Sequence, residues 1–289
     1  KTYGLIEAVK SVTLTLGAGE TIAMVGHNGA GKTTLIKLML GLIRPTKGAL
    51  RVLGEDPLTG NPAIRARLGY LPENLALNPA LSGRETLSFY AALKRAPRTQ
   101  IGPLLERVGI AAAADRAVRT YSKGMRQRLG LAQALLGDPR ILLLDEPTTG
   151  LDPALRRDFY MFLNELRAGG TTILLCSHAL SELEDRADRV VIMARGAMIA
   201  NGTLDELRRI AQLPTRIRVR LGDVSQQALG GTGDWTAIDG HTLETHVQPE
   251  RKISLLRAAM DAGIADIDVT PPTLDELYAH FQGGTEHGR

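Results

Sequence analysis

Residues 26–33 read GHNGAGKT and have the residue types that bind phosphate groups. An apolar run at 21–25 precedes them and apolar residues at helical spacing follow, which is the context that makes this pattern specific. Glycines let backbone amides curl around phosphates, and the helix N-terminus adds a positive dipole. We therefore predict a site for nucleotide phosphates whose contacts are Gly26, His27, Asn28, Gly29, Ala30, Gly31, Lys32, Thr33 and Thr34.

Two side chains of this loop have more specific expected roles. Lys32 is expected to reach the β and γ phosphates and so to take part in catalysis, and the hydroxyl of Thr33 is expected to bind Mg²⁺. The alternative is a glycine turn that binds nothing, and the flanking strand and helix disfavour it.

The second candidate group is ILLLDEP at 141–147, an apolar strand that ends in two carboxylates. Ligands of α/β sheets lie at the carboxyl ends of the strands, so Asp145 is expected to hold Mg²⁺. Adjacent strand residues point to opposite faces, so Glu146 can aim at the attacking water, as general base, only if the strand ends before it. An Asp-Glu pair after an apolar run is common by itself. The presence of the phosphate loop in the same chain is what favours a functional role for this pair.

His178 follows another apolar strand at 171–176. A lone histidine there is usually a structural residue, but at the same sheet edge as Lys32 it could donate to the γ phosphate and sense its loss. Cys176, two positions earlier, is interpreted as a small buried apolar residue. As the only cysteine it cannot form an intramolecular disulfide, which favours a reducing compartment.

The elements that must position these residues alternate between strands and helices, which predicts a mostly parallel sheet covered on both faces. Residues 75–138 contain helical patterns without a convincing strand, so a helical subdomain is expected there. Beyond the phosphate-loop elements, strands are expected at 49–53, 141–144, 171–176 and 189–193, and helices at 84–95, 99–108, 123–136, 153–168 and 179–187.

The residue pattern changes after Leu213 and Pro214, where Arg alternates with apolar residues at 215–221. A helix at 223–229, strands near 235–238 and 242–247, a helix at 250–262, a strand at 265–269 and a helix at 273–281 complete a pattern suited to a ferredoxin-like unit. The predicted domains are therefore 1–213 and 214–289, the second a small α+β domain.

Charge and hydropathy limit the possible partners. The chain carries a net +4, but residues 84–128 hold ten Lys and Arg against three acidic residues. This is either a solvated helical face or a surface for anionic lipid, phosphates or an acidic partner. An aromatic content of 4% argues against a base-stacking platform for nucleic acid. No apolar run approaches the roughly 20 residues that span a bilayer.

Further motifs carry a family resemblance. Residues 120–135, TYSKGMRQRLGLAQAL, resemble the signature sequence of ABC ATPases, and GLDP at 150–153 resembles their D-loop. With the motifs above, the resemblance covers residues 1 to about 213. It implies a P-loop NTPase core with an inserted helical subdomain, and a head-to-tail homodimer that encloses two ATP molecules. It also implies that Tyr3 stacks on adenine, that Ser122 and Gly124 bind the γ phosphate across the interface, and that Asp152 links the two sites.

Three positions depart from the family pattern. Glu73, in GYLPEN at 69–74, stands where the family usually has Gln in the loop that contacts Mg²⁺ and couples to the membrane partner. A carboxylate can bind Mg²⁺, but it adds negative charge near the phosphates. In the signature, Lys123 replaces Gly and Met125 replaces Gln, which changes the donors offered to the opposing nucleotide.

The motif details, including His27, LSGRETL at 81–87 and CSH, are most similar to ATPase subunits of the Nos system, which serves copper-centre maturation of nitrous oxide reductase. This resemblance implies a polytopic membrane permease, a periplasmic partner that handles copper or sulfur, and a peripheral position on the cytoplasmic face of the inner membrane. Drug or lipid exporters share many of these motifs and remain an alternative. A soluble ABC ATPase acting on ribosomes or DNA is another, although such proteins usually have two cassettes or a long coiled coil.

Overall fold

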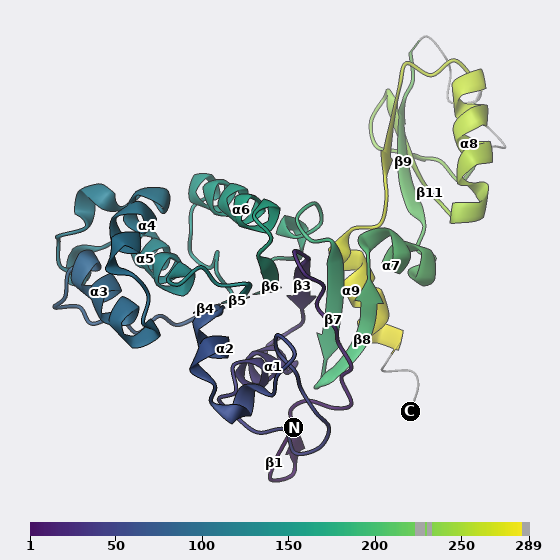
Figure 1. Ribbon diagram of the computed structural model, residues 1–289. Coiled ribbons are helices and arrows are strands. Elements are labelled where there is room, and N and C mark those ends of the chain that lie inside the picture. The colour runs from purple at the N-terminus through teal and green to yellow at the C-terminus, as the bar shows by residue number, and fades with distance from the viewer. Residues whose placement is uncertain (223–228, 230–232, 285–289) are drawn as a thin grey trace. The chain divides into compact units, whose positions relative to one another are not determined.

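The computed structural model describes residues 1–222, 229 and 233–284, and its contacts divide the chain into two compact units, Lys1–Asn201 and Gly202–Arg289 (Figure 1). The division falls before the boundary expected at Leu213 and Pro214, because helix α7 (Leu204–Ala211) contacts the last helix of the second unit. No helix in the described ranges is both long and apolar enough to cross a membrane.

The first unit is built on a six-stranded sheet. Strands β4, β5, β6, β3 and β7 lie side by side in this order and pair in parallel, and β8 lies beside β7 at the edge of the sheet. All five residues of β3 are buried, as expected for a strand covered on both faces. The expected α/β fold is confirmed. The strand order is β4 (Leu68–Leu71), β5 (Ile141–Asp145), β6 (Thr172–Ser177), β3 (Thr21–Val25), β7 (Arg189–Ala194) and β8 (Ala197–Gly202).

Three helices form the insertion between β4 and β5, and this part of the expected fold class is confirmed. They are α3 (Gly83–Lys94), α4 (Ile101–Arg107) and α5 (Lys123–Leu135), which contact one another, and α5 also contacts β4 (Figure 1). Ser82 and Glu85 form a capping box at the start of α3. The remaining elements of this unit are β1 (Thr2–Tyr3), β2 (Ile6–Glu7), α1 (Lys32–Met39), α2 (Pro62–Ala66), α6 (Pro153–Ala168) and the 3₁₀ turns η1 (Pro57–Thr59), η2 (Arg98–Gln100), η3 (Ala111–Ala113), η4 (Val118–Thr120) and η5 (Leu180–Glu182).

Two expected elements are wrong, and two strands of the six-stranded sheet were missed. The short strands β1 and β2 and the helices α2 and α7 were not predicted either. Residues 49–53 form no strand, because Val52 and Glu55 exchange backbone hydrogen bonds across a tight turn with positive φ at Leu53 and Gly54. Residues 179–187 form only the short turn η5, because a single 3₁₀ turn brings the apolar residues three positions apart to the core. Strands β4 and β8 were not predicted, since each is short or only half-buried.

The second unit contains a four-stranded antiparallel sheet in the order β10–β11–β9–β12. Strand β11 lies between β9 and β10, which is the split arrangement expected of a ferredoxin-like unit. The helix expected at 223–229 falls outside the described residues, apart from Leu229. The elements after α7 are β9 (Thr215–Arg220), β10 (Thr236–Ala237), β11 (Thr242–Val247), α8 (Pro249–Asp261), β12 (Asp266–Thr270) and α9 (Leu274–Gly284).

Candidate nucleotide-binding site

The phosphate loop connects β3 to α1, and its conformation depends on glycine. Gly31 adopts φ +104°, and a Cβ there would lie 2.5 Å from the carbonyl oxygen of Ala8. A Cβ at Gly26 would lie 2.5 Å from the carbonyl oxygen of Met193. Neither position can accept a side chain without moving backbone. Helix α1 therefore begins at Lys32 with its first amides next to a glycine cradle.

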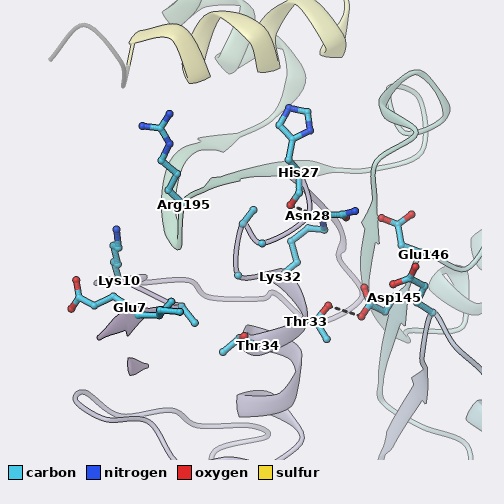
Figure 2. Close-up of a pocket in the computed structure, with 16 residues that line it drawn as sticks. Glu7, Lys10, His27, Asn28, Lys32, Thr33, Thr34, Asp145, Glu146 and Arg195 are labelled. Atoms are coloured by element: carbon cyan, nitrogen blue, oxygen red, sulfur yellow. Dashed lines mark hydrogen bonds between the residues drawn. The ribbon is translucent and has the colours of Figure 1, made fainter. Parts of the chain in front are cut away.

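Lys32 is buried, and its Nζ donates to the carbonyl oxygen of Gly26 and, at 3.5 Å, to that of His27. The ammonium is thus held inside the curve of the loop (Figure 2). An anion entering this loop would meet the lysine charge together with the amides and dipole of the α1 N-terminus. This geometry supports the expected phosphate contacts.

Thr33 and Asp145 face each other across the site, with the Thr33 hydroxyl donating to Asp145 Oδ2 at 3.0 Å (Figure 2). Asp145 is 3% exposed, and this burial is the main reason that its pKa is raised. The nearby carboxylates of Glu146 and Glu73 raise the pKa further, while the Thr33 hydrogen bond and Lys32 lower it. A hydroxyl and a carboxylate with unbalanced negative charge nearby are the oxygen donors that Mg²⁺ prefers, so these residues fit the ion.

Strand β5 ends at Asp145, as the general-base hypothesis for Glu146 requires. Glu146 itself adopts φ +50°, and its backbone N–H donates to the carbonyl oxygen of Cys176 at 2.9 Å. A residue other than glycine held in the left-handed region is strained, and such strain is concentrated at functional sites. The turn directs the Glu146 carboxylate away from the Asp145 side chain (Figure 2).

The Glu146 carboxylate contacts the last residue of β6 and the residue after it. His178 Nδ1 lies 2.8 Å from Glu146 Oε2, the backbone N–H of His178 donates to the same oxygen at 3.4 Å, and the Ser177 hydroxyl donates to it at 3.5 Å. The carboxylate is buried, whereas the imidazole is 66% exposed. Burial also raises the pKa of the Cys176 thiol, which keeps it protonated inside β6.

A cavity of about 510 Å³ collects most of the predicted residues. It includes all of 27–34, with Glu73, Asp145 and Glu146, which lie 39 or more residues further along the sequence. Three charged lining residues were missed: Glu7 and Lys10 before β3, and Arg195 in the turn after β7 (Figure 2). No motif marks them, because they reach the cavity only through the packing of β2 and β7 around the loop.

Six predicted residues do not line this cavity. Two of them are next to it: Gly26 begins the loop, and His178 contacts Glu146. The other four are Tyr3, Ser122, Gly124 and Asp152. Tyr3 is 46% exposed and packs under the Lys1 ammonium, 4.8 Å from the ring centroid. Ser122 and Asp152 are N-caps, accepting from the backbone N–H of Met125 at 3.2 Å and of Leu155 at 2.9 Å. Gly124 lies buried at the start of α5. The stacking of Tyr3 on adenine and the roles of Ser122, Gly124 and Asp152 at a dimer interface remain predictions.

The fold and site are those of a P-loop nucleotide-binding protein. Residues 9–149 match the family model described as ABC transporter. The chain is 37% identical over 298 residues to the daunorubicin resistance ATP-binding protein DrrA3 of Streptomyces coeruleorubidus, covering 98% of this chain and 93% of the relative. It is 32% identical to the Nod factor export ATP-binding protein I of Bradyrhizobium diazoefficiens, covering 98% and 94%.

Among solved structures, one described as an ATP-binding subunit of an ABC transporter superposes with a TM-score of 0.67 at 33% identity, covering 72% of this chain and 88% of that one. The chain therefore belongs to the ATP-binding subunits of ABC transporters. It is a member of an ATP-hydrolysing enzyme family, and ABC ATPases generally bind ATP and Mg²⁺.

Proposed function

We propose that this chain powers an ABC exporter of the drug or lipid type. ATP-binding subunits of this family typically pair with a membrane permease and work as dimers. The two relatives named above, a drug-resistance and a Nod factor export protein, cover almost the whole chain, including its second unit, and this supports the exporter assignment. The copper-maturation role has no such support, and we rank it second. Either role would put the chain peripherally on the cytoplasmic face of the inner membrane, beside its permease.

The residues of the site divide the chemistry among them. Lys32 and the loop amides would hold the β and γ phosphates, while Thr33 and Asp145 would hold Mg²⁺, with Glu73 near it. The bound ion would neutralise phosphate charge. Glu146 would accept a proton from the attacking water, and His178 would hold the Glu146 carboxylate and sense the γ phosphate.

The observation that carries this proposal is the position of Glu146. Its carboxylate follows β5 in a strained turn, is buried in the nucleotide cavity, and lies 2.8 Å from His178 Nδ1. A general base needs a fixed position and a partner that orients it, and both conditions are met here. In a homodimer, Ser122 and Gly124 of a second copy would close over this cavity, which would exclude water during the reaction.

Glu146→Gln tests the proposal directly. The amide keeps the volume and a hydrogen-bond acceptor but cannot take a proton, so ATP binding should persist, the closed dimer should accumulate, and turnover should fall at least about 100-fold. ATPase rate, nucleotide affinity and dimer mass by light scattering are the measurements. Glu165→Gln on the exposed face of α6 is the matched control and should hydrolyse ATP normally. Near-normal ATPase in Glu146→Gln would eliminate the assigned base.

The membrane partner separates the competing roles. The tagged full chain is purified from detergent-solubilised native membranes and its companions are identified by mass spectrometry. A polytopic permease without a copper-handling protein supports the exporter, whereas a permease with a periplasmic copper-handling protein restores the maturation role. Recovery with ribosomes or DNA and without a membrane protein contradicts both.

A further inference from the structure

A cluster of polar side chains joins the turn that follows Glu146 to the turn that follows His178. Glu182 lies at its centre, in η5, four positions after His178. Its carboxylate accepts hydrogen bonds from the Thr148 hydroxyl at 3.3 Å and from Arg156. Thr148 is two positions after Glu146, so one carboxylate contacts both of the turns that begin at the two catalytic candidates.

Helix α6 and the segment after η5 supply the rest of the cluster. The Tyr160 hydroxyl donates to Glu182 Oε2 at 3.1 Å, and Arg156 Nε donates to the carbonyl oxygen of Leu151 at 2.9 Å. The Arg186 guanidinium lies 4.1 Å from the Tyr160 ring centroid. Arg156 therefore fixes the backbone of the turn after β5 at the same time as it pairs with Glu182 in the turn after β6.

The surroundings make this cluster stiff. The Glu182 side chain is 19% exposed and Thr148 is 4% exposed, so water competes weakly for their hydrogen bonds. Burial is the first reason that the pKa of Tyr160 is raised to about 12, so the phenol stays a donor. Breaking a partly buried charge pair by removing one partner leaves the other charge desolvated.

We infer that Glu182 is a positioning residue, which keeps Glu146 and His178 in contact by tying together the two turns that follow them. The inference rests on the proposed function, because it assigns Glu146 as base. Glu182 touches neither the nucleotide cavity nor the Glu146 side chain, and it acts through the backbone of both turns. Its loss should slow the chemical step without weakening the hold of Lys32 and the loop amides on ATP.

The test compares Glu182→Gln with Glu20→Gln in the full chain, purified in detergent with its permease. Glu20 is as buried as Glu182, at 19% exposure, and also pairs with an arginine, Arg189, but it lies just before β3, at the opposite end of the sheet. We expect Glu182→Gln to lower kcat about 10-fold with KM for ATP within twofold of wild type. Glu20→Gln should leave both kinetic constants within twofold while lowering the Tm by a similar amount.

Two outcomes overturn the inference: equal losses of kcat in the two variants, or a Glu182→Gln variant that loses only Tm. If Glu182→Gln does not fold, Thr148→Val removes one hydroxyl at constant volume and should lower kcat two- to threefold at unchanged KM, and an unchanged kcat contradicts the inference. Failure of the proposed function is separate, because it shows as retained ATPase in Glu146→Gln.

Discussion

The amino and carboxyl ends of the strands form two opposite edges of the six-stranded sheet, and buried charged side chains have different electrostatic environments at these two edges. At the amino edge, Glu20 and Arg189 form a two-pronged pair with N–O distances of 2.7 and 3.0 Å, and Arg189 is the first cause that the pKa of Glu20 is lowered. At the carboxyl edge, burial raises the pKa of Asp145, which lies near two other carboxylates. The first edge stabilises the fold, whereas the second keeps charge in an unfavourable state that a nucleotide and a cation would relieve.

Among the variants that test this comparison, Lys32→Ala should have the largest effect, which is a loss of ATP affinity at the carboxyl edge. It removes the ammonium that the loop itself contributes to the cavity, so ATP affinity should fall more than about 100-fold, as measured by calorimetry. Lys37→Ala, an exposed lysine five positions further along α1, is the matched control and should bind ATP normally. Retained affinity in Lys32→Ala would overturn the phosphate assignment.

Asp145→Asn should separate activity from stability at the carboxyl edge. The neutral amide is easier to bury, so the nucleotide-free chain should become more stable by about 1 kcal/mol at pH 8, measured by urea unfolding. Mg²⁺-dependent turnover should fall at least about 100-fold, because an ion ligand is lost. A variant that is both less stable and fully active would show that the Asp145 charge is not unfavourable.

Glu20→Gln should have the opposite and smaller effect. Removing one partner of the pair leaves Arg189 with a weaker acceptor, and the free energy of unfolding should fall by about 1 kcal/mol at pH 7. ATPase should stay within twofold of wild type. A loss of turnover without a loss of stability would mean that the amino edge contributes to the site.

The pH dependence of the free energy of unfolding should give the smallest and most specific effect. The pKa of Glu20 is lowered in the folded chain from its usual 4.5, so its ionised form contributes stability above that value, and the contribution is lost as pH falls through the folded pKa. The stability difference between wild type and Glu20→Gln should be constant above about pH 6 and shrink below 4.5. For Asp145→Asn, whose pKa is raised in the wild type, the advantage of the variant should shrink as pH falls toward that raised pKa.

The sequence identified residues that the structure brings together in one cavity, although some of the elements around them were predicted wrongly. The loop at 26–33, Asp145 and Glu146 were found because each chemistry needs fixed residue types in consecutive positions after an apolar strand. The strand expected at 49–53 and the helix expected at 179–187 failed, because apolar residues packed on a core look alike in strands, helices and turns. Lys10 and Arg195 could not be found, since they meet the loop only in three dimensions.

The sequence by itself determined which residue types are available for chemistry: glycines that permit the loop, a lysine and a threonine at the start of α1, and two carboxylates at the end of β5. These depend on local backbone geometry, which consecutive residues encode. The tertiary structure decided how that chemistry is held. The positive φ of Glu146, its contact with His178 and the Glu182 cluster that joins the two turns each require chain segments about 30 residues apart to pack together, and no local pattern records such long-range packing.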